Sequence, residues 1–151
     1  MHKLFLLLLP LLFTALFVSP ALGDSDDFGS SYNSEDWRVT KAARLIKKEQ
    51  YRKAITQLHK AVSKDKKNAD AWNLLGFASR KTGDLETSAD AYAKALALEP
   101  KHKGALEYQG ELFITQGAIG KARENLAKLI ALCPGGCDER SKLEQALAKL
   151  Q

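Results

Sequence analysis

The 151-residue sequence contains few of the residues that most often carry chemistry, with three histidines and two cysteines. His59 and His102 have no ligand-like residues near them in the sequence, which argues against a histidine metal site and leaves both as surface histidines. A nucleophile elbow is absent. The glycine-containing stretch 133–137 lacks the Lys and the Ser or Thr of a phosphate-binding loop. We therefore expect a protein that is not an enzyme, with no catalytic residues, no metal and no cofactor.

Long apolar runs are absent beyond residue 23. Before it, Lys3 precedes an apolar stretch over 4–18, and small residues at Ala21 and Gly23 suit a signal peptidase. These features predict a signal peptide over 1–23, cleavage before Asp24, and a periplasmic or secreted protein that is not stably inserted in a membrane. An uncleaved membrane anchor is the alternative, because 4–22 is just long enough to span a bilayer.

Lys and Arg are absent from 4–36, where the segment 24–34 is rich in Ser, Asp and Gly and has no apolar period. Such a composition predicts a flexible acidic leader. Residues 37–151 carry 22 basic and 13 acidic side chains, a net charge of +9. One explanation of this charge is a solvated helical surface. The alternative is that the basic surface binds an acidic partner. The leader could also lie over the basic part and compete with such a partner.

Proline is scarce beyond residue 35, where apolar residues recur at helical spacing. The only prolines there, Pro100 and Pro134, are 34 residues apart, and Gly76 and Gly110 share that offset. The register divides the chain into three repeats, 35–68, 69–102 and 103–136. Each is expected to be two antiparallel helices, which makes the fold all-α.

Small and turn-forming residues mark the same register. Gly76 and Gly110 fall where helix axes approach closely. Gly83 suits the left-handed residue after a first helix, and Asp84 is placed to cap the second helix. Segment 137–151 is predicted to be a capping helix with an apolar stripe formed by Leu143, Ala146, Leu147 and Leu150.

The middle repeat resembles the tetratricopeptide repeat (TPR) signature through Trp72, Leu75, Gly76, Gly83, Tyr92, Ala95 and Pro100. The resemblance implies about three repeats in a right-handed superhelix closed by the capping helix. It also implies a scaffold that binds a protein or peptide partner in its concave groove. The ending LCPGGC, followed by an acidic helix start, resembles small secreted bacterial TPR proteins.

The resemblance also assigns groove positions to the first helix of each repeat. Phe77 would be the aromatic anchor, although ordinary surface is the alternative interpretation for the whole set. The pattern of TPR modules that clamp a terminal carboxylate is absent, because Phe77 and Glu111 follow the glycines where Asn is required. The groove positions are Val39, Ala43, Ile46, Lys47, Asn73, Phe77, Arg80, Lys81, Glu107, Glu111 and Ile114.

Cys133 and Cys137 flank a Pro-Gly-Gly turn. In a secreted protein two cysteines most simply form one disulfide, which here would tie the capping helix to the last repeat. The alternative is a thiol-based carrier of Cu(I) or of redox equivalents. The spacing, three residues between the cysteines, differs from the two of thioredoxin-like motifs. Nucleic acid is not expected as a partner, because no stacking aromatics line the basic stretch 41–52.

Overall fold

The structure of the chain is a computed structural model that describes residues 36–150. This range contains seven α-helices and no strand, which confirms the all-α prediction. The signal peptide predicted over 1–23 and the leader predicted over 24–34 lie outside the described residues. None of the described helices is long and apolar enough to cross a membrane. The helices are α1 Trp37–Lys47, α2 Tyr51–Lys64, α3 Ala69–Lys81, α4 Leu85–Leu98, α5 Lys103–Thr115, α6 Ile119–Leu132 and α7 Asp138–Ala148.

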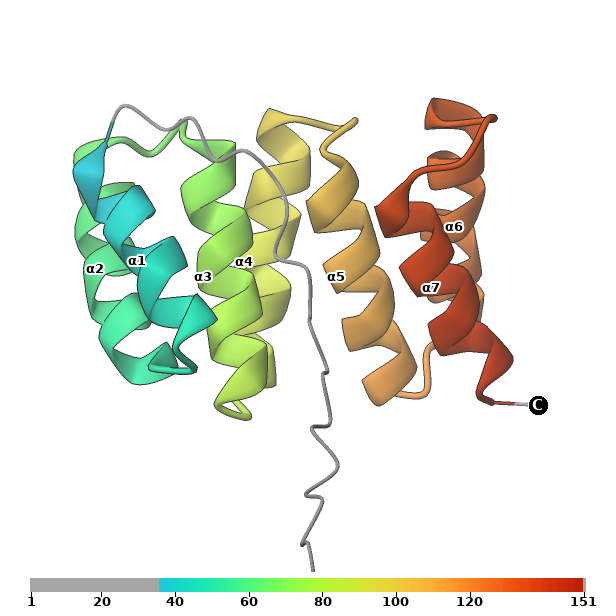
Figure 1. Cartoon of the computed structure of the whole chain (residues 1–151), viewed down its shortest axis with the longest axis horizontal. Helices are drawn as coiled ribbons and strands as arrows, with labels where there is room; N and C mark the ends of the chain where they lie inside the picture. The colour runs from blue at the N-terminus through green and yellow to red at the C-terminus, as the bar shows by residue number, and fades with distance from the viewer. Residues whose placement is uncertain (1–35, 151) are drawn as a thin grey trace, which may run out of the picture.

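The helices stack in order along the long axis of the molecule as antiparallel pairs (Figure 1). The pairs α1–α2, α3–α4 and α5–α6 fall within the three predicted repeats. Helix α7 packs against both α5 and α6, so it covers the end of the last pair. The right-handed sense of the superhelix stays a prediction.

Two layers of helices follow from which helices touch. Successive first helices are in contact, α1 with α3, α3 with α5, and α5 with α7. Among the described residues, the second helices α2, α4 and α6 make no such contacts with one another. The first helices therefore form the tighter, inner layer of a curved stack, and the second helices form a wider outer layer.

Glycine permits the closest helix approaches, as predicted for Gly76 and Gly110. A Cβ on Gly76 would lie 2.6 Å from two ring carbons of Tyr92, which is fully buried on α4. A Cβ on Gly110 would lie 2.6 Å from a methyl carbon of Leu143. Leu143 belongs to α7 and not to the third repeat, so the capping helix supplies the side chain that fills this gap.

The apolar stripe predicted for the capping helix is correct at one end only. Leu143 is fully buried, and Leu147 packs against the same cluster. Leu150, in contrast, is 52% exposed. Helix α7 ends at Ala148, so Leu150 no longer follows the helical register.

The turns between paired helices use a left-handed residue at equivalent positions. Gly83 has a φ value of +84°, as predicted, and Gly117, which lies 34 residues later, has a φ value of +73°. Asp84 then accepts a hydrogen bond from the Thr87 amide at 3.0 Å and caps α4. In the first repeat the same position is Glu49, with φ +55°. A residue with a Cβ is strained in this region, and glycine is not.

Replacing Glu49 by glycine should therefore stabilise the chain. Glu49 is exposed, so the change sacrifices little packing, and relief of backbone strain raises the free energy of unfolding by roughly 1 kcal/mol. The matched control is Lys48→Gly, because Lys48 has an ordinary φ of −98° and should be destabilised by the same substitution. Urea denaturation measures both. Equal destabilisation of the two variants would show that position 49 is not strained.

Candidate functional site

Five of the residues predicted to line the groove are buried and do not form accessible surface. Val39 and Asn73 have no exposed area, and Ile46, Phe77 and Glu107 are between 2% and 5% exposed. For Val39 and Ile46 the reason is the pairing of α1 with α2 and α3, which places both side chains in the core of the first two repeats.

Phe77 is enclosed by aromatic rings from neighbouring helices, which corrects the expectation of an open anchor. Its ring centroid lies 4.9 Å from that of Tyr108 on α5 and 6.3 Å from that of Tyr51 on α2. Tyr108 is in turn 6.4 Å from Tyr92. The rings form a continuous support beneath the inner layer. Sequence reasoning missed Tyr108, although its spacing from Ala105 and Leu112 places all three on one helical stripe.

Lys47, Arg80, Lys81, Glu111 and Ile114 keep part or all of their side chains exposed. The two basic residues of α3 lie close to the aromatic support, with the Arg80 guanidinium 5.8 Å and the Lys81 ammonium 5.4 Å from the centroid of Phe77. Ala43, named with these positions, is half-buried. The structure therefore brings Arg80, Lys81 and Glu111 together at the junction of the second and third repeats.

Arg80 on α3 and Glu111 on α5 form an ion pair across this junction. The Arg80 side chain is 15% exposed and that of Glu111 is 28% exposed, so the pair is reachable from solvent but partly desolvated. Burial lowers the pKa of Arg80, but the adjacent Tyr92 and Glu111 outweigh it and the pKa is raised overall. Burial also raises the pKa of the Tyr92 hydroxyl. Arg80 is thus a fixed positive charge on the inner layer.

Glu107 lies one turn before Glu111 on the same helix and has a very different environment. Burial raises the pKa of its carboxyl group to about 8, and the nearby negative charge of Glu111 acts in the same direction. Lys142 on α7 opposes this shift. Glu107 therefore holds a proton at neutral pH and contributes a carboxylic acid, not a second negative charge, to the inner layer.

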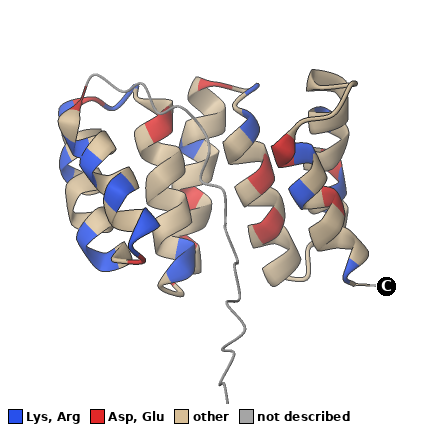
Figure 2. Ribbon diagram, in the orientation of Figure 1, with Lys and Arg blue, Asp and Glu red and all other residues tan. Residues whose placement is uncertain are grey.

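Charge is distributed unevenly over the array. Neither α1 nor α2 contains Asp or Glu, whereas both contain several Lys and Arg. In Figure 2 the Lys and Arg positions are concentrated on α1 and α2, at the left end of the array, whereas α5 carries Asp or Glu positions. The inner layer is therefore strongly basic at α1, and at α5 it carries the negative charge of Glu111, which is paired with Arg80.

His102 differs from the surface histidine expected from the sequence. Its Nδ1 atom accepts a hydrogen bond from the Ala105 amide at 3.1 Å and caps α5, while Nε2 lies 3.1 Å from Asp70 Oδ1 on α3. Only 10% of the side chain is exposed. His102 thus has a structural role that links two repeats, and its position immediately before an apolar helix was the available signal.

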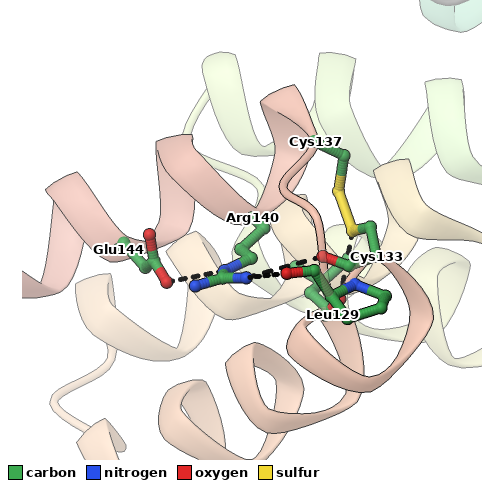
Figure 3. Close-up of a disulfide and its surroundings, with 6 residues drawn as sticks. Leu129, Cys133, Cys137, Arg140 and Glu144 are labelled. Carbon is green, nitrogen blue, oxygen red and sulfur yellow. Dashed lines mark hydrogen bonds and ion pairs between the residues drawn. A yellow bond between two sulfur atoms is a disulfide. The ribbon is translucent and has the colours of Figure 1, made fainter.

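The cysteine turn connects the last repeat to the capping helix. Cys133 and Cys137 are joined by a disulfide in the structure, and Arg140 lies beside it (Figure 3). The Arg140 guanidinium donates to the carbonyl of Pro134 at 3.3 Å and to Glu144 at 2.8 Å. The described residues include no group of three or more side chains suited to a metal ion.

The tetratricopeptide repeat family model matches residues 39–101 and 78–136. The chain therefore belongs to the TPR family, whose repeats generally act as non-enzymatic scaffolds for protein interaction. Over 64 residues it is 38% identical to protein FlbA of Caulobacter vibrioides. That match covers 42% of this chain and 11% of FlbA, so the chain corresponds to a small part of that protein's length.

Solved TPR structures have the same fold. The first TPR of Spaghetti (RPAP3), bound to the HSP90 peptide SRMEEVD, aligns with a TM-score of 0.66 at 17% identity, over 75% of this chain and 90% of that one. The Sgt2 TPR domain of Aspergillus fumigatus gives 0.67 at 23% identity, over 75% and 76%. A double mutant of MamA RS-1 gives 0.61 at 28% identity, over 65% and 55%.

The buried acid of the inner layer should make stability depend on pH. Between the ordinary glutamate pKa of 4.5 and about 8, the folded chain holds a proton on Glu107 that the unfolded chain releases. The free energy of unfolding should therefore fall as pH rises through this window. Glu107→Gln should remove that decline and be the more stable form at about pH 8, by more than about 1 kcal/mol.

Chemical denaturation at about pH 5 and about pH 8 measures this dependence. Glu124→Gln, at an exposed position on α6, is the matched control and should leave the pH dependence unchanged. If Glu107→Gln follows the pH dependence of the unmodified chain, the Glu107 carboxyl is ionised in the folded state at neutral pH and the assignment is wrong.

Proposed function

We propose that this protein is an exported scaffold that binds an extended segment of a partner protein on its inner layer, at the junction of α3 and α5. The observation that carries the proposal is the solvent-accessible ion pair between Arg80 and Glu111. A carboxylate or backbone carbonyl of the bound segment can replace Glu111 as the partner of Arg80. Hydrogen-bond donors of the segment can then pair with Glu111.

The surroundings of the pair favour binding at this place. Phe77 lies under Arg80 and Lys81, and Tyr108 packs against Phe77, so the basic groups lie over buried rings. Charged groups held in this way lose little conformational freedom when a ligand arrives.

Structurally similar TPR domains bind peptides, which supports a peptide segment as the kind of ligand. The first TPR of RPAP3 holds the HSP90 peptide SRMEEVD, and the second TPR of human RPAP3 holds the HSP70 peptide SGPTIEEVD. We propose that this chain also binds a peptide segment of its partner. Recognition of a terminal carboxylate by paired Lys and Asn is not proposed, because Phe77 and Glu111 occupy the positions that follow Gly76 and Gly110.

Export is the second part of the proposal and rests on the signal-like segment 1–23 together with the cysteine pair. A periplasmic or extracellular location would oxidise Cys133 and Cys137, and the bond would fix α7 to the end of α6. N-terminal sequencing of the protein from the envelope or medium should begin at Asp24, and thiol alkylation should add mass only after reduction. A chain that begins at Met1, or one fully alkylated without reduction, would contradict export.

Binding on the inner layer can be tested with peptides selected from a random library against the unmodified protein. In the double variant Arg80→Glu with Glu111→Arg, the ion pair is retained with its direction reversed. Selected peptides should lose affinity by at least about tenfold. The matched control exchanges charge on the outer layer, with Lys128→Glu and Glu124→Arg on α6, and should change affinity by less than about twofold.

Circular dichroism of each variant confirms that the helical fold is retained before affinities are compared. Peptides that bind the reversed-pair variant as well as the unmodified protein would overturn the assignment to the junction of α3 and α5. A reduction of the same size in the control variant would attribute the effect to general electrostatics and equally contradict the site.

A further inference from the structure

The outer layer contains a groove that the inner-layer site does not use. The backbones of α2 and α4 do not approach each other closely, and a cavity of about 570 Å³ lies between these helices and the start of α3. A second cavity of about 470 Å³ adjoins it along α2. The two share His59 and Ser63, so they form one continuous depression, named here the α2–α4 groove.

The cavity between the helices has an apolar floor. It is formed by Val62, the half-buried ring of Trp72, Ala97 and Leu98. Trp72 is fixed in place, because its indole nitrogen donates to the Lys66 carbonyl at 2.9 Å. Leu98 is 38% exposed, so part of its side chain is accessible from the cavity. This floor can bury one large apolar side chain.

The rim of the groove is basic. Lys66 and Lys94 line the cavity between the helices, and Arg38, Lys60 and Lys64 line the adjoining one. Neither cavity is lined by Asp or Glu. Such a concentration of one sign of charge attracts an anionic partner.

One end of this rim binds a carboxylate of the chain itself. Asp36 Oδ1 lies 3.2 Å from the Arg38 guanidinium, and Oδ2 lies 3.7 Å from the Lys64 ammonium. The spacing of the rim also suits an extended chain. Lys60 and Lys64 are one helical turn apart, roughly 6 Å along the axis, and alternate side chains of an extended strand are roughly 6.6 Å apart.

We propose that the α2–α4 groove is a second docking surface, which binds an acidic, extended protein segment that carries one large apolar side chain. The apolar side chain enters the cavity against Trp72 and Leu98. Acidic residues on either side pair with the lysines of the rim. This surface lies in the outer layer, so the inference does not depend on the inner-layer site proposed above, and one protein could hold two partners.

The test uses the full chain and a fluorescent synthetic peptide with glutamates on both sides of one phenylalanine, followed by fluorescence anisotropy. The double variant Lys66→Glu and Lys94→Glu should weaken binding at least about tenfold. The control, Lys128→Glu with Lys149→Glu, makes the same change in net charge at exposed positions on α6 and after α7. It should weaken binding by no more than about twofold.

A second pair of variants tests the apolar pocket without changing charge. Leu98→Ser should weaken the phenylalanine peptide at least about threefold and leave a peptide with alanine in that place unaffected. Ile130→Ser is the matched control, since Ile130 is 42% exposed on α6. Leu98 is partly exposed, so this variant should fold even if the double lysine variant does not.

Three results would overturn the proposal. The alanine and phenylalanine peptides could bind equally well, which would reduce the effect to charge alone. The control variants could weaken binding as much as the groove variants. A single-stranded oligonucleotide could displace the peptide at equal concentration, which would identify a general polyanion surface. The reversed pair of Arg80 and Glu111 should leave peptide binding intact, so failure of this proposal is distinguishable from failure of the inner-layer site.

Discussion

The approach of the Tyr92 ring to Gly76 is the contact on which the rest of the array depends. The ring is fully buried against Gly76, where an added Cβ would lie 2.6 Å from two of the ring carbons. Tyr92 then lies 6.4 Å from Tyr108 on the next repeat, and Tyr108 packs against Phe77. The close packing of α3 on α4 within the middle repeat therefore also positions the rings that contact α5 of the next repeat.

The same packing explains why the two layers differ in what they offer a partner. Inner helices that touch in succession bury their large side chains and leave Arg80 and Glu111 as charged groups over a rigid floor. Outer helices whose backbones stay further apart leave a cavity beside Trp72, where the Lys94 ammonium lies 4.5 Å from the centroid of the ring. The stack of helix pairs thus presents a charged surface on the inner layer and a groove with an apolar floor on the outer layer.

The repeat register, the helix ends and the close glycines could be predicted because each follows from a local rule. Gly83 and Gly117 adopt the left-handed conformation, and Asp84 caps its helix. The solvent exposure of the predicted groove side chains could not be predicted in this way. Phe77 holds a groove position in the family, but Tyr51 and Tyr108 enclose it here. The sequence spacing of a helix does not reveal the size of the side chains that face it from other helices.

Other features depend on residues that are distant in the sequence. His102 caps its own helix, which is a local effect, but its contact with Asp70 arises only when two repeats stack. Glu49 occupies the position of Gly83 in the first repeat, and the strained φ there follows from the register and not from residue type. The α2–α4 groove arises from a contact that is missing between two helices, which composition does not encode.

The most direct test of this account is the stability of Gly76→Ala compared with Gly120→Ala, measured by chemical denaturation. The new methyl group at position 76 meets the Tyr92 ring, so this variant should lose about 1–3 kcal/mol. Gly120 has nothing within 4 Å of an added Cβ, and alanine there should stabilise α6 by roughly 0.5–1 kcal/mol. A Gly76→Ala protein as stable as the unmodified chain would show that the ring does not rest against Gly76, and would contradict the packing on which both faces depend.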